Sequence, residues 1–308
     1  MATPIYKLES NSNDIYIKRD DLIPYSFGGN KARKGILFFE DIIDKKCNAV
    51  VTYGSASSNH VRIVSNKCCE LDIPCYVVSP TETAKSTSNS KMYKIFNAKI
   101  IEVPIQEVSN TIDETVYLLK KNGKNPYFIP GGGHGNIGTQ AYVNCYNEIL
   151  EFEKKEEVTF DYIFHASGTG TTQAGLVCGS IINNDKKNIV GISIARKNPR
   201  GRDVILESVM DYLCSIKMQN NYDSINDKVV FTDKYIQSGY GTYSPEILDT
   251  IKTSLIRYGI PMDTTYVGKA FYGMNEYIKE NCINKKKILF IHTGGSPLFF
   301  DDLEVLSE

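Results

Sequence analysis

Several features that mark particular classes of protein are scarce in this chain of 308 residues. It has only four histidines, and no two of them have the spacing of a helical zinc site. No apolar run approaches the roughly 18 residues that a membrane-spanning helix needs. The net charge of −1 provides no positive excess for nucleic acid or for an anionic membrane. The sequence therefore argues against a metal site, a membrane protein and a nucleic-acid-binding protein.

The eight cysteines are scattered, and none forms a CxxC pair. The first residues, MATPIYKLESN, lack the basic and apolar segments of a secretory signal. We therefore expect reduced thiols and a cytoplasmic protein. The length is enough to bury roughly three quarters of the unfolded surface, in one large domain or two modest ones.

Short apolar runs alternate with helix-length amphipathic stretches, which is typical of an α/β protein with a mostly parallel sheet. Because the apolar runs are continuous rather than alternating, we expect helices on both faces of the strands. The expected strands are Ala49–Tyr53, Cys75–Val78, Lys99–Val103, Tyr162–His165, Ile189–Ile194 and Ile288–His292. The expected helices are Arg33–Lys45, Ser58–Leu71, Asn110–Asn122, Thr172–Asn183, Pro245–Tyr258 and Lys269–Asn281.

Glycine-rich loops stand where strands lead into helices. Ligands of open α/β sheets bind outside the carboxyl ends of the strands, so these loops predict one shared crevice. The loop PGGGHGNIG, which contains His134, is interpreted as a structural turn, with the alternative that it lines the entrance to this crevice. The glycine-rich loops are GGNK (28–31), YGSASSNH (53–60), PGGGHGNIG (130–138), SGTGTT (167–172), SGYGTYSPE (238–246) and HTGGSP (292–297).

The SGTGTT loop has the character of a phosphate site. It follows an apolar run and precedes a helix, so backbone N–H groups and the helix dipole favour an anion there. The hydroxyls of Ser167, Thr169, Thr171 and Thr172 add further donors. The pattern matches neither GxGxxG nor GxxxxGK[ST], which favours a phosphate monoester over a dinucleotide or ATP. A tight strand-to-helix turn without a ligand is an equally good explanation of the loop by itself.

Lys31 lies between a Gly-Gly-Asn turn and the start of a helix. The positive end of the helix dipole favours a neutral amine at that position, and imine chemistry needs a neutral amine. Taken alone, the residue is better explained as an ordinary exposed lysine.

The order of six motifs distinguishes between these alternatives. KRDD with GGNKxRK, GSxxSNHxR, SGTGTTxAG, SGYGxxxPE, YxGKAFYGM and HTGGxPLF occur in this order from Lys18 to Phe299. In this respect the chain resembles the pyridoxal-phosphate (PLP) enzymes that include D-cysteine desulfhydrase and 1-aminocyclopropane-1-carboxylate deaminase. The resemblance implies the tryptophan synthase β-like fold, with two open, mostly parallel twisted sheets flanked by helices. We expect a larger PLP-binding domain of residues 1–36 and 147–308, and a smaller domain of residues 37–146 that closes over a small amino-acid substrate. We expect a homodimer.

The resemblance also assigns roles to residues. Lys31 matches the Schiff-base lysine, which would also move the Cα proton. Ser58 has an alternative role as a plain helix N-cap, and it could act as cap and ligand together. The implied cofactor-binding residues are Lys31, Asn59, Gly168, Thr169, Gly170, Thr171, Thr172 and Thr293. The implied substrate-binding residues are Ser58, Asn59, His60, Tyr240 and Tyr266, of which Ser58, Tyr240 and Tyr266 are expected to be catalytic together with Lys31.

Val267 is the informative departure from the family pattern. In the aminocyclopropanecarboxylate deaminases a glutamate at the matching position bonds the pyridine nitrogen, and valine cannot do so. Thr293 is the remaining partner for that nitrogen, as in the desulfhydrase branch. A hydroxyl leaves the ring a weaker electron sink, which suits β-elimination. The sequence SNH, rather than SNQ, also favours that branch.

The expected activity is therefore D-cysteine desulfhydrase-like β-elimination, giving pyruvate, ammonia and the leaving group. Three alternatives remain open: a β-replacement synthase, aminocyclopropanecarboxylate deamination, and a PLP-binding protein that has lost catalysis. Retention of Lys31, Ser58, Tyr240 and Tyr266 argues against the last of these.

Overall fold

The computed structural model describes residues 2–218 and 222–307. The chain divides into two compact units, residues 1–30 with 138–308 and residues 31–137. Both junctions fall a few residues before the limits expected from sequence. The reason is that helices α1 (Asn30–Asp44) and α5 (Asn136–Glu156) each pack into the core of the unit that follows them.

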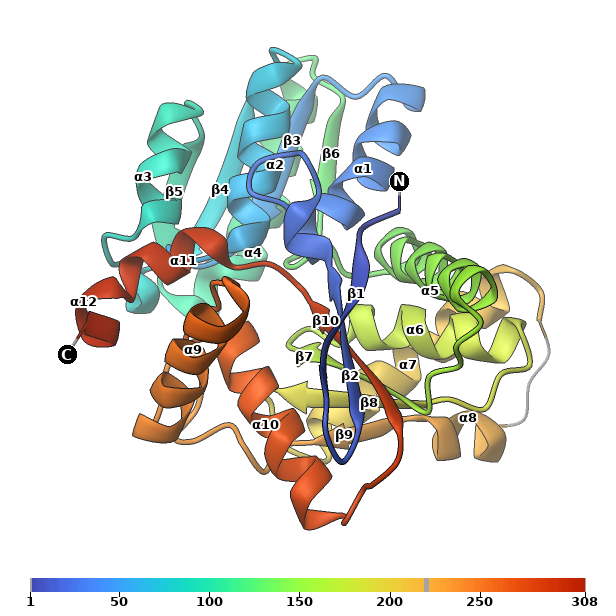
Figure 1. The fold of residues 1–308 in the computed structure, drawn as a ribbon. Coiled ribbons are helices and arrows are strands. Elements are labelled where there is room, and N and C mark those ends of the chain that lie inside the picture. The colour runs from blue at the N-terminus through green and yellow to red at the C-terminus, as the bar shows by residue number, and fades with distance from the viewer. Residues whose placement is uncertain (1, 219–221, 308) are drawn as a thin grey trace. The chain divides into compact units, whose positions relative to one another are not determined.

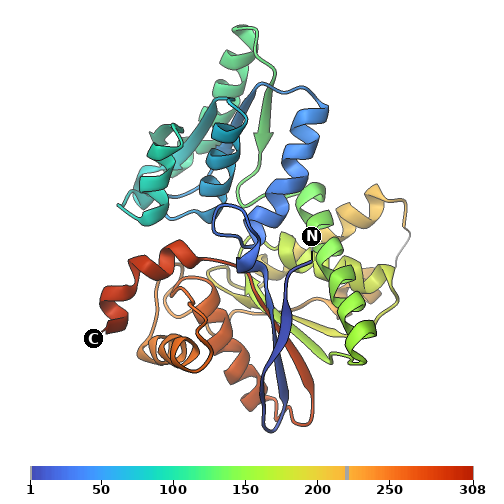
Figure 2. The ribbon, with the colours of Figure 1, turned by 45° about the horizontal axis from the view of Figure 1, so that its top comes forward.

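The first unit contains a six-stranded sheet with the order β1-β2-β10-β7-β8-β9. The hairpin β1–β2 is antiparallel, and the other neighbours are parallel. Figures 1 and 2 show this blue hairpin beside the red strand β10. The strands are β1 (Ile5–Ser10), β2 (Asp14–Arg19), β7 (Tyr162–Ser167), β8 (Asn188–Ser193), β9 (Val230–Thr232) and β10 (Lys287–His292). Besides α5, the helices are α6 (Thr171–Ile182), α7 (Arg200–Ser215), α8 (Tyr222–Lys228), α9 (Pro245–Tyr258), α10 (Val267–Glu280), α11 (Ser296–Asp301) and α12 (Leu303–Ser307).

The second unit contains a four-stranded, wholly parallel sheet with the order β5-β4-β3-β6. Together the two units confirm the expected class of two mostly parallel sheets flanked by helices. The strands are β3 (Ala49–Tyr53), β4 (Cys75–Pro80), β5 (Lys99–Val103) and β6 (Pro126–Ile129). Besides α1, the helices are α2 (Asn59–Glu70), α3 (Ser88–Ile95) and α4 (Val108–Lys121).

Both faces of the larger sheet are buried. In β10, Leu289 and Ile291 pack into one apolar cluster, and Ile288 and Phe290 pack into another on the opposite face. Side chains alternate between the faces of a strand, so a strand covered on both sides must be apolar throughout. This explains why the continuous apolar runs located β3, β4, β7, β8 and β10 correctly.

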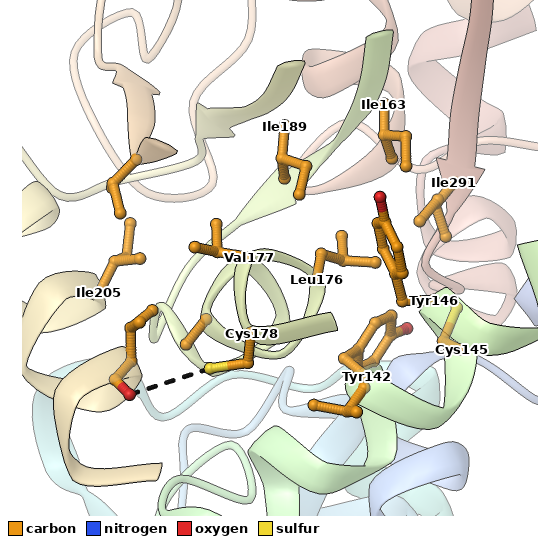
Figure 3. Packing of buried hydrophobic residues seen from close by; sticks show 14 of the residues in the cluster. Tyr142, Cys145, Tyr146, Ile163, Leu176, Val177, Cys178, Ile189, Ile205 and Ile291 are labelled. Carbon is orange, nitrogen blue, oxygen red and sulfur yellow. Dashed lines mark hydrogen bonds between the residues drawn. The ribbon is translucent and has the colours of Figure 1, made fainter. Parts of the chain in front are cut away.

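Helix α6 packs closely against α5 along its length. A Cβ added to Gly175 would lie 2.4 Å from the Cβ of Tyr142, and one added to Gly179 would lie 2.4 Å from the Cβ of Tyr146. Figure 3 shows both tyrosines beside Leu176 and Val177, with Cys178 Sγ 3.9 Å from the carbonyl oxygen of Val209. The helix is therefore held on several sides within the core.

None of the described helices combines the length and the apolar character that crossing a bilayer requires. The eight cysteines all lie in the described ranges and are free thiols.

Candidate active site

The loop from Ser167 to Thr171 connects the carboxyl end of β7 to α6, as the sequence predicts. Gly170 is the N-cap of α6, with φ +92°, and no side chain of a described residue caps this helix. The N–H groups of the first turn of a helix have no partner within the helix. An uncapped helix start beside the hydroxyls of Thr171 and Thr172 fits a phosphate group.

The Gly-Gly-Asn turn (28–30) contacts both this loop and the loop that contains Thr293. Gly28 and Gly29 have φ +59° and +94°, and a Cβ on Gly29 would lie 2.8 Å from the carbonyl oxygen of Thr293. The Asn30 N–H donates to that oxygen over 2.8 Å, and Asn30 Nδ2 donates to Thr172 Oγ1 over 3.2 Å. Three of the predicted loops therefore meet at Asn30. Lys31 is the next residue in the chain.

Lys31 Nζ donates to the carbonyl oxygen of Gly132 over 3.0 Å. Burial lowers the pKa of the Lys31 ammonium from 10.5 to about 8. The lowered pKa gives this lysine a larger neutral fraction near pH 7 than an exposed lysine has, which is the condition for imine chemistry. Gly132 belongs to the loop that the sequence analysis treats as a structural turn, so that loop also provides a contact for the predicted Schiff-base lysine.

Ser58 is the N-cap of α2, and its Oγ accepts a hydrogen bond from the N–H of Val61 over 3.3 Å. The predicted capping role is thereby confirmed. Asn59 follows as the first residue of the helix, and its Oδ1 accepts from Arg62 Nη1 (2.5 Å) and from Asn89 Nδ2 (3.0 Å). These two donors fix the orientation of the amide, so its NH₂ group points away from them and is presented as a donor.

His60 is buried. Its Nε2 lies 2.9 Å from Thr52 Oγ1, and that hydroxyl donates to the carbonyl oxygen of Ile129 over 2.8 Å. A hydroxyl has one proton, so Thr52 accepts from His60 and the proton of the imidazole is on Nε2. Burial, followed by the charges of Lys31 and Lys34, holds the pKa of His60 well below its usual value. The imidazole is therefore neutral and held by Thr52, which leaves the backbone N–H as the group of His60 best suited to an anion.

Tyr240 and Tyr266 lie together, with their hydroxyl oxygens 2.5 Å apart and their rings edge to face. Lys269 supports the loop before Tyr240, because its buried Nζ donates to the carbonyl oxygens of Ile236 (3.1 Å) and Gly239 (2.9 Å). Asp263 supports the other tyrosine, because its Oδ1 accepts from the N–H of Tyr266 over 2.7 Å. The structure thus brings together the two tyrosines expected to face the substrate.

Thr293 follows β10 and is 7% exposed, yet its hydroxyl makes no hydrogen bond with any residue that the structure describes. His292 shapes this turn: its Nε2 donates to the carbonyl oxygen of Pro261 (2.8 Å), and its Nδ1 accepts from the N–H of Gly294 (3.3 Å). Val267 is fully buried in an apolar cluster of the same unit. An accessible hydroxyl that has no partner among the described residues can donate to an acceptor such as a pyridine nitrogen.

The sequence analysis missed four supporting residues. Arg62 and Lys269 stand inside the motifs that were recognised, and Asp263 precedes a helix, where an aspartate commonly caps. These three could have been found. Asn89 has no local signal, because its contact with Asn59 joins residues 30 positions apart.

The model of the family described as "Pyridoxal-phosphate dependent enzyme" matches residues 1–294, and the chain belongs to this family. PLP is its cofactor, as the six motifs imply. A Serratia proteamaculans protein named D-cysteine desulfhydrase is 30% identical over 97% of this chain and 93% of its own length. A Pyrococcus abyssi protein named provisionally as a 1-aminocyclopropane-1-carboxylate deaminase is 31% identical, over 97% of this chain and 90% of its own.

A crystal structure described as an "ACC deaminase homologue" has a TM-score of 0.89 and 31% identity, covering 100% of this chain and 93% of that one. The expected fold and the expected family are therefore confirmed together.

Proposed function

We propose that this enzyme is a lyase of the D-cysteine desulfhydrase type, which removes the leaving group from Cβ of a small amino acid and yields pyruvate and ammonia. PLP supplies the electron sink that makes the Cα proton removable. We also propose that the enzyme is a cytoplasmic homodimer, in line with the sequence-based expectation.

The observation that carries this proposal is the contrast between Val267 and Thr293. The residue after Tyr266 is a fully buried valine in an apolar cluster, so no carboxylate stands where the deaminase branch has one. Thr293 is a buried residue whose hydroxyl oxygen stays accessible and makes no hydrogen bond with the described residues. A neutral hydroxyl donor makes the PLP ring a weaker electron sink than a carboxylate does. This weaker sink is sufficient for elimination of a good leaving group from Cβ.

The other predicted site residues have separate roles in binding and proton transfer. Lys31 holds the cofactor and, with its lowered pKa, moves the Cα proton. The start of α2, from Ser58 to His60, binds the substrate carboxylate through helix N–H groups and the Asn59 amide. The hydroxyl pair of Tyr240 and Tyr266 shares a hydrogen bond and can pass a proton toward the amino acid or its leaving group.

A panel of substrates tests the proposal. Holoenzyme is incubated with D-cysteine, L-cysteine, β-chloro-D-alanine, D-serine and aminocyclopropanecarboxylate, and pyruvate, sulfide and 2-oxobutyrate are measured side by side. We expect pyruvate and sulfide in equal amounts from D-cysteine, and no 2-oxobutyrate from the cyclopropane. Diversion of the product by added thiols, away from pyruvate, would identify a β-replacement synthase instead. Turnover of the cyclopropane alone would establish the deaminase activity.

Asn89→Ala tests the orientation of Asn59. The substitution removes one of the two donors that hold Asn59 Oδ1. We expect the affinity of the apoprotein for PLP to fall roughly five- to twentyfold, the equivalent of one hydrogen bond. Asn125→Ala, which removes the exposed hydrogen bonds from Asn125 Nδ2 to the carbonyl oxygens of Lys45 and Lys46 in the same unit, is the control and should leave PLP affinity unchanged. Unaltered PLP affinity in Asn89→Ala, with only a lower Tm, would reduce Asn89 to a purely structural residue.

A further inference from the structure

A cavity lies wholly within the 31–137 unit, beside the 53–60 loop. Its volume is about 500 Å³, and it lies against one face of the four-stranded sheet beside α3. Val77 and Ser79 come from alternate positions of β4, and Ile100 and Glu102 from alternate positions of β5, so the four side chains share that face. The cavity is large enough for a small organic molecule and has an apolar floor.

The wall of this cavity carries an excess of positive charge. Lys85, Lys91 and Lys94 line it, with Glu102 as the one acidic residue among its lining. The three ammonium groups form no ion pair or hydrogen bond with residues in the described ranges. Three cations against one anion leave a net charge of +2, which matches a dianion.

Ser79 is the second, independent feature of the cavity. The residue is 6% exposed, at the carboxyl end of a parallel strand, and it lines the cavity. Its hydroxyl has no hydrogen-bond partner within residues 2–218 and 222–307. Its oxygen is open to the cavity, where it can donate a hydrogen bond to a ligand.

We propose that this cavity binds a phosphate monoester with a compact apolar body. The charge of the head group, close to −2 near neutral pH, matches the lysines, and Ser79 donates to one of its oxygens. The body lies on Val77, Ile100 and the Tyr93 ring. This site is distinct from the loop at Ser167–Thr172, which belongs to the other unit and takes the cofactor phosphate.

The cavity shares a wall with the loop that carries Ser58. Ala56 lines it, and the carbonyl oxygen of Ala56 accepts from Thr87 Oγ1 over 2.8 Å. Tyr93 also lines it, and its hydroxyl donates to the carbonyl oxygen of Ser58 over 2.7 Å. An occupant in contact with Ala56 and Tyr93 therefore restricts the 55–58 segment. Amino-acid affinity and ester affinity are then linked reciprocally.

Phenyl phosphate and inorganic phosphate are the probes, titrated calorimetrically into PLP-saturated holoenzyme in a phosphate-free buffer. We expect saturable binding of one phenyl phosphate per chain, several-fold tighter than inorganic phosphate. The double variant Lys91→Gln/Lys94→Gln should weaken binding at least tenfold, and Ser79→Ala several-fold. The matched control is Lys120→Gln/Lys121→Gln, which removes the same charge from α4 in the same unit and should bind as the unaltered protein does. Tm values confirm that each variant is folded.

The proposed site would be overturned if Lys91→Gln/Lys94→Gln lost no more affinity for phenyl phosphate than the control pair, or if neither cavity variant lost affinity. Equal affinity for the two anions would overturn the assignment to an organic ester. Amide hydrogen exchange over residues 55–58 should slow at saturating phenyl phosphate, and unchanged exchange would overturn the link to Ser58. Because binding is measured directly, none of these outcomes depends on whether the enzyme is a desulfhydrase.

Discussion

Lys31→Ala is expected to lower turnover by roughly three to five orders of magnitude, because one side chain both holds the cofactor and moves the proton. The visible absorbance that PLP gains when bound to a lysine should also disappear. The loop at Ser167–Thr172 remains intact, so noncovalent retention of the cofactor should be only partly reduced. Steady-state kinetics and absorbance spectra of the purified variant measure both effects.

The matched control is Lys45→Ala, at the other end of α1. Lys45 is exposed, pairs with Asp41 at the surface and lies 5.5 Å from the centre of the Tyr127 ring; an exposed ion pair of this kind contributes less than about 1 kcal/mol. Lys45→Ala should keep full activity and colour. Borohydride treatment of the unaltered protein should fix the cofactor onto Lys31, as peptide mapping can show. Retention of colour and turnover in Lys31→Ala would remove the central assignment.

The fold was largely predictable where apolar runs were continuous. Strand β2 and helix α5 were missed for two different reasons. Strand β2 contains Lys18, which is fully buried but paired with Glu148 over 2.6 Å, and a buried ion pair hides the strand from a search for apolar runs. Helix α5 was missed although Tyr142, Cys145, Tyr146 and Ile149 follow helical spacing. It begins inside the glycine-rich 130–138 loop, which drew the prediction toward a turn.

The site also has features that were predictable from the sequence and features that were not. Glycine loops at strand ends could be recognised because a short stretch of sequence contains the turn, the helix start and the donors. What could not be predicted are contacts that cross the fold, such as Asn89 with Asn59 or Asn30 with Thr172. His60 was correctly placed at the start of α2. Its buried bond to Thr52 depends on the pairing of β3 with β6, which the sequence did not reveal because β6 was not expected.

Val267→Glu is expected to lower the free energy of unfolding by several kcal/mol at neutral pH. Val267 is fully buried, and its N–H donates to Asp263 Oδ2 over 3.2 Å. Asp263 is itself buried, and burial raises its pKa to about 7. A second carboxyl group next to it would lose its hydration and, once ionised, would face a like charge, so its own pKa should rise.

The pH dependence follows from that rise. A carboxyl group with a folded-state pKa above its unfolded value of about 4.3 binds more protons in the folded state between the two values. The deficit of Val267→Glu against the unaltered protein should therefore be smallest near pH 4, where only the burial of a neutral carboxyl group costs free energy, and should grow as the pH rises through the window up to the folded-state pKa. Urea unfolding of the apoproteins from pH 4 to 8 measures this, and Val267→Gln should show a deficit that does not change with pH.

The same variant separates the two branches of the family. If the glutamate side chain at position 267 stays within the apolar cluster, saturating PLP will not restore the stability that Val267→Glu loses. In that case the Thr293 hydroxyl is the partner of the pyridine nitrogen, and Thr293→Val should weaken PLP binding by about 1–3 kcal/mol. If PLP instead restores the stability of Val267→Glu at pH 8, the carboxylate has reached the cofactor ring. Its negative charge would then be balanced by a proton on the pyridine nitrogen, which strengthens the electron sink. Opening of the cyclopropane substrate by Val267→Glu, together with normal PLP binding by Thr293→Val, would show that position 267 rather than Thr293 controls the reaction.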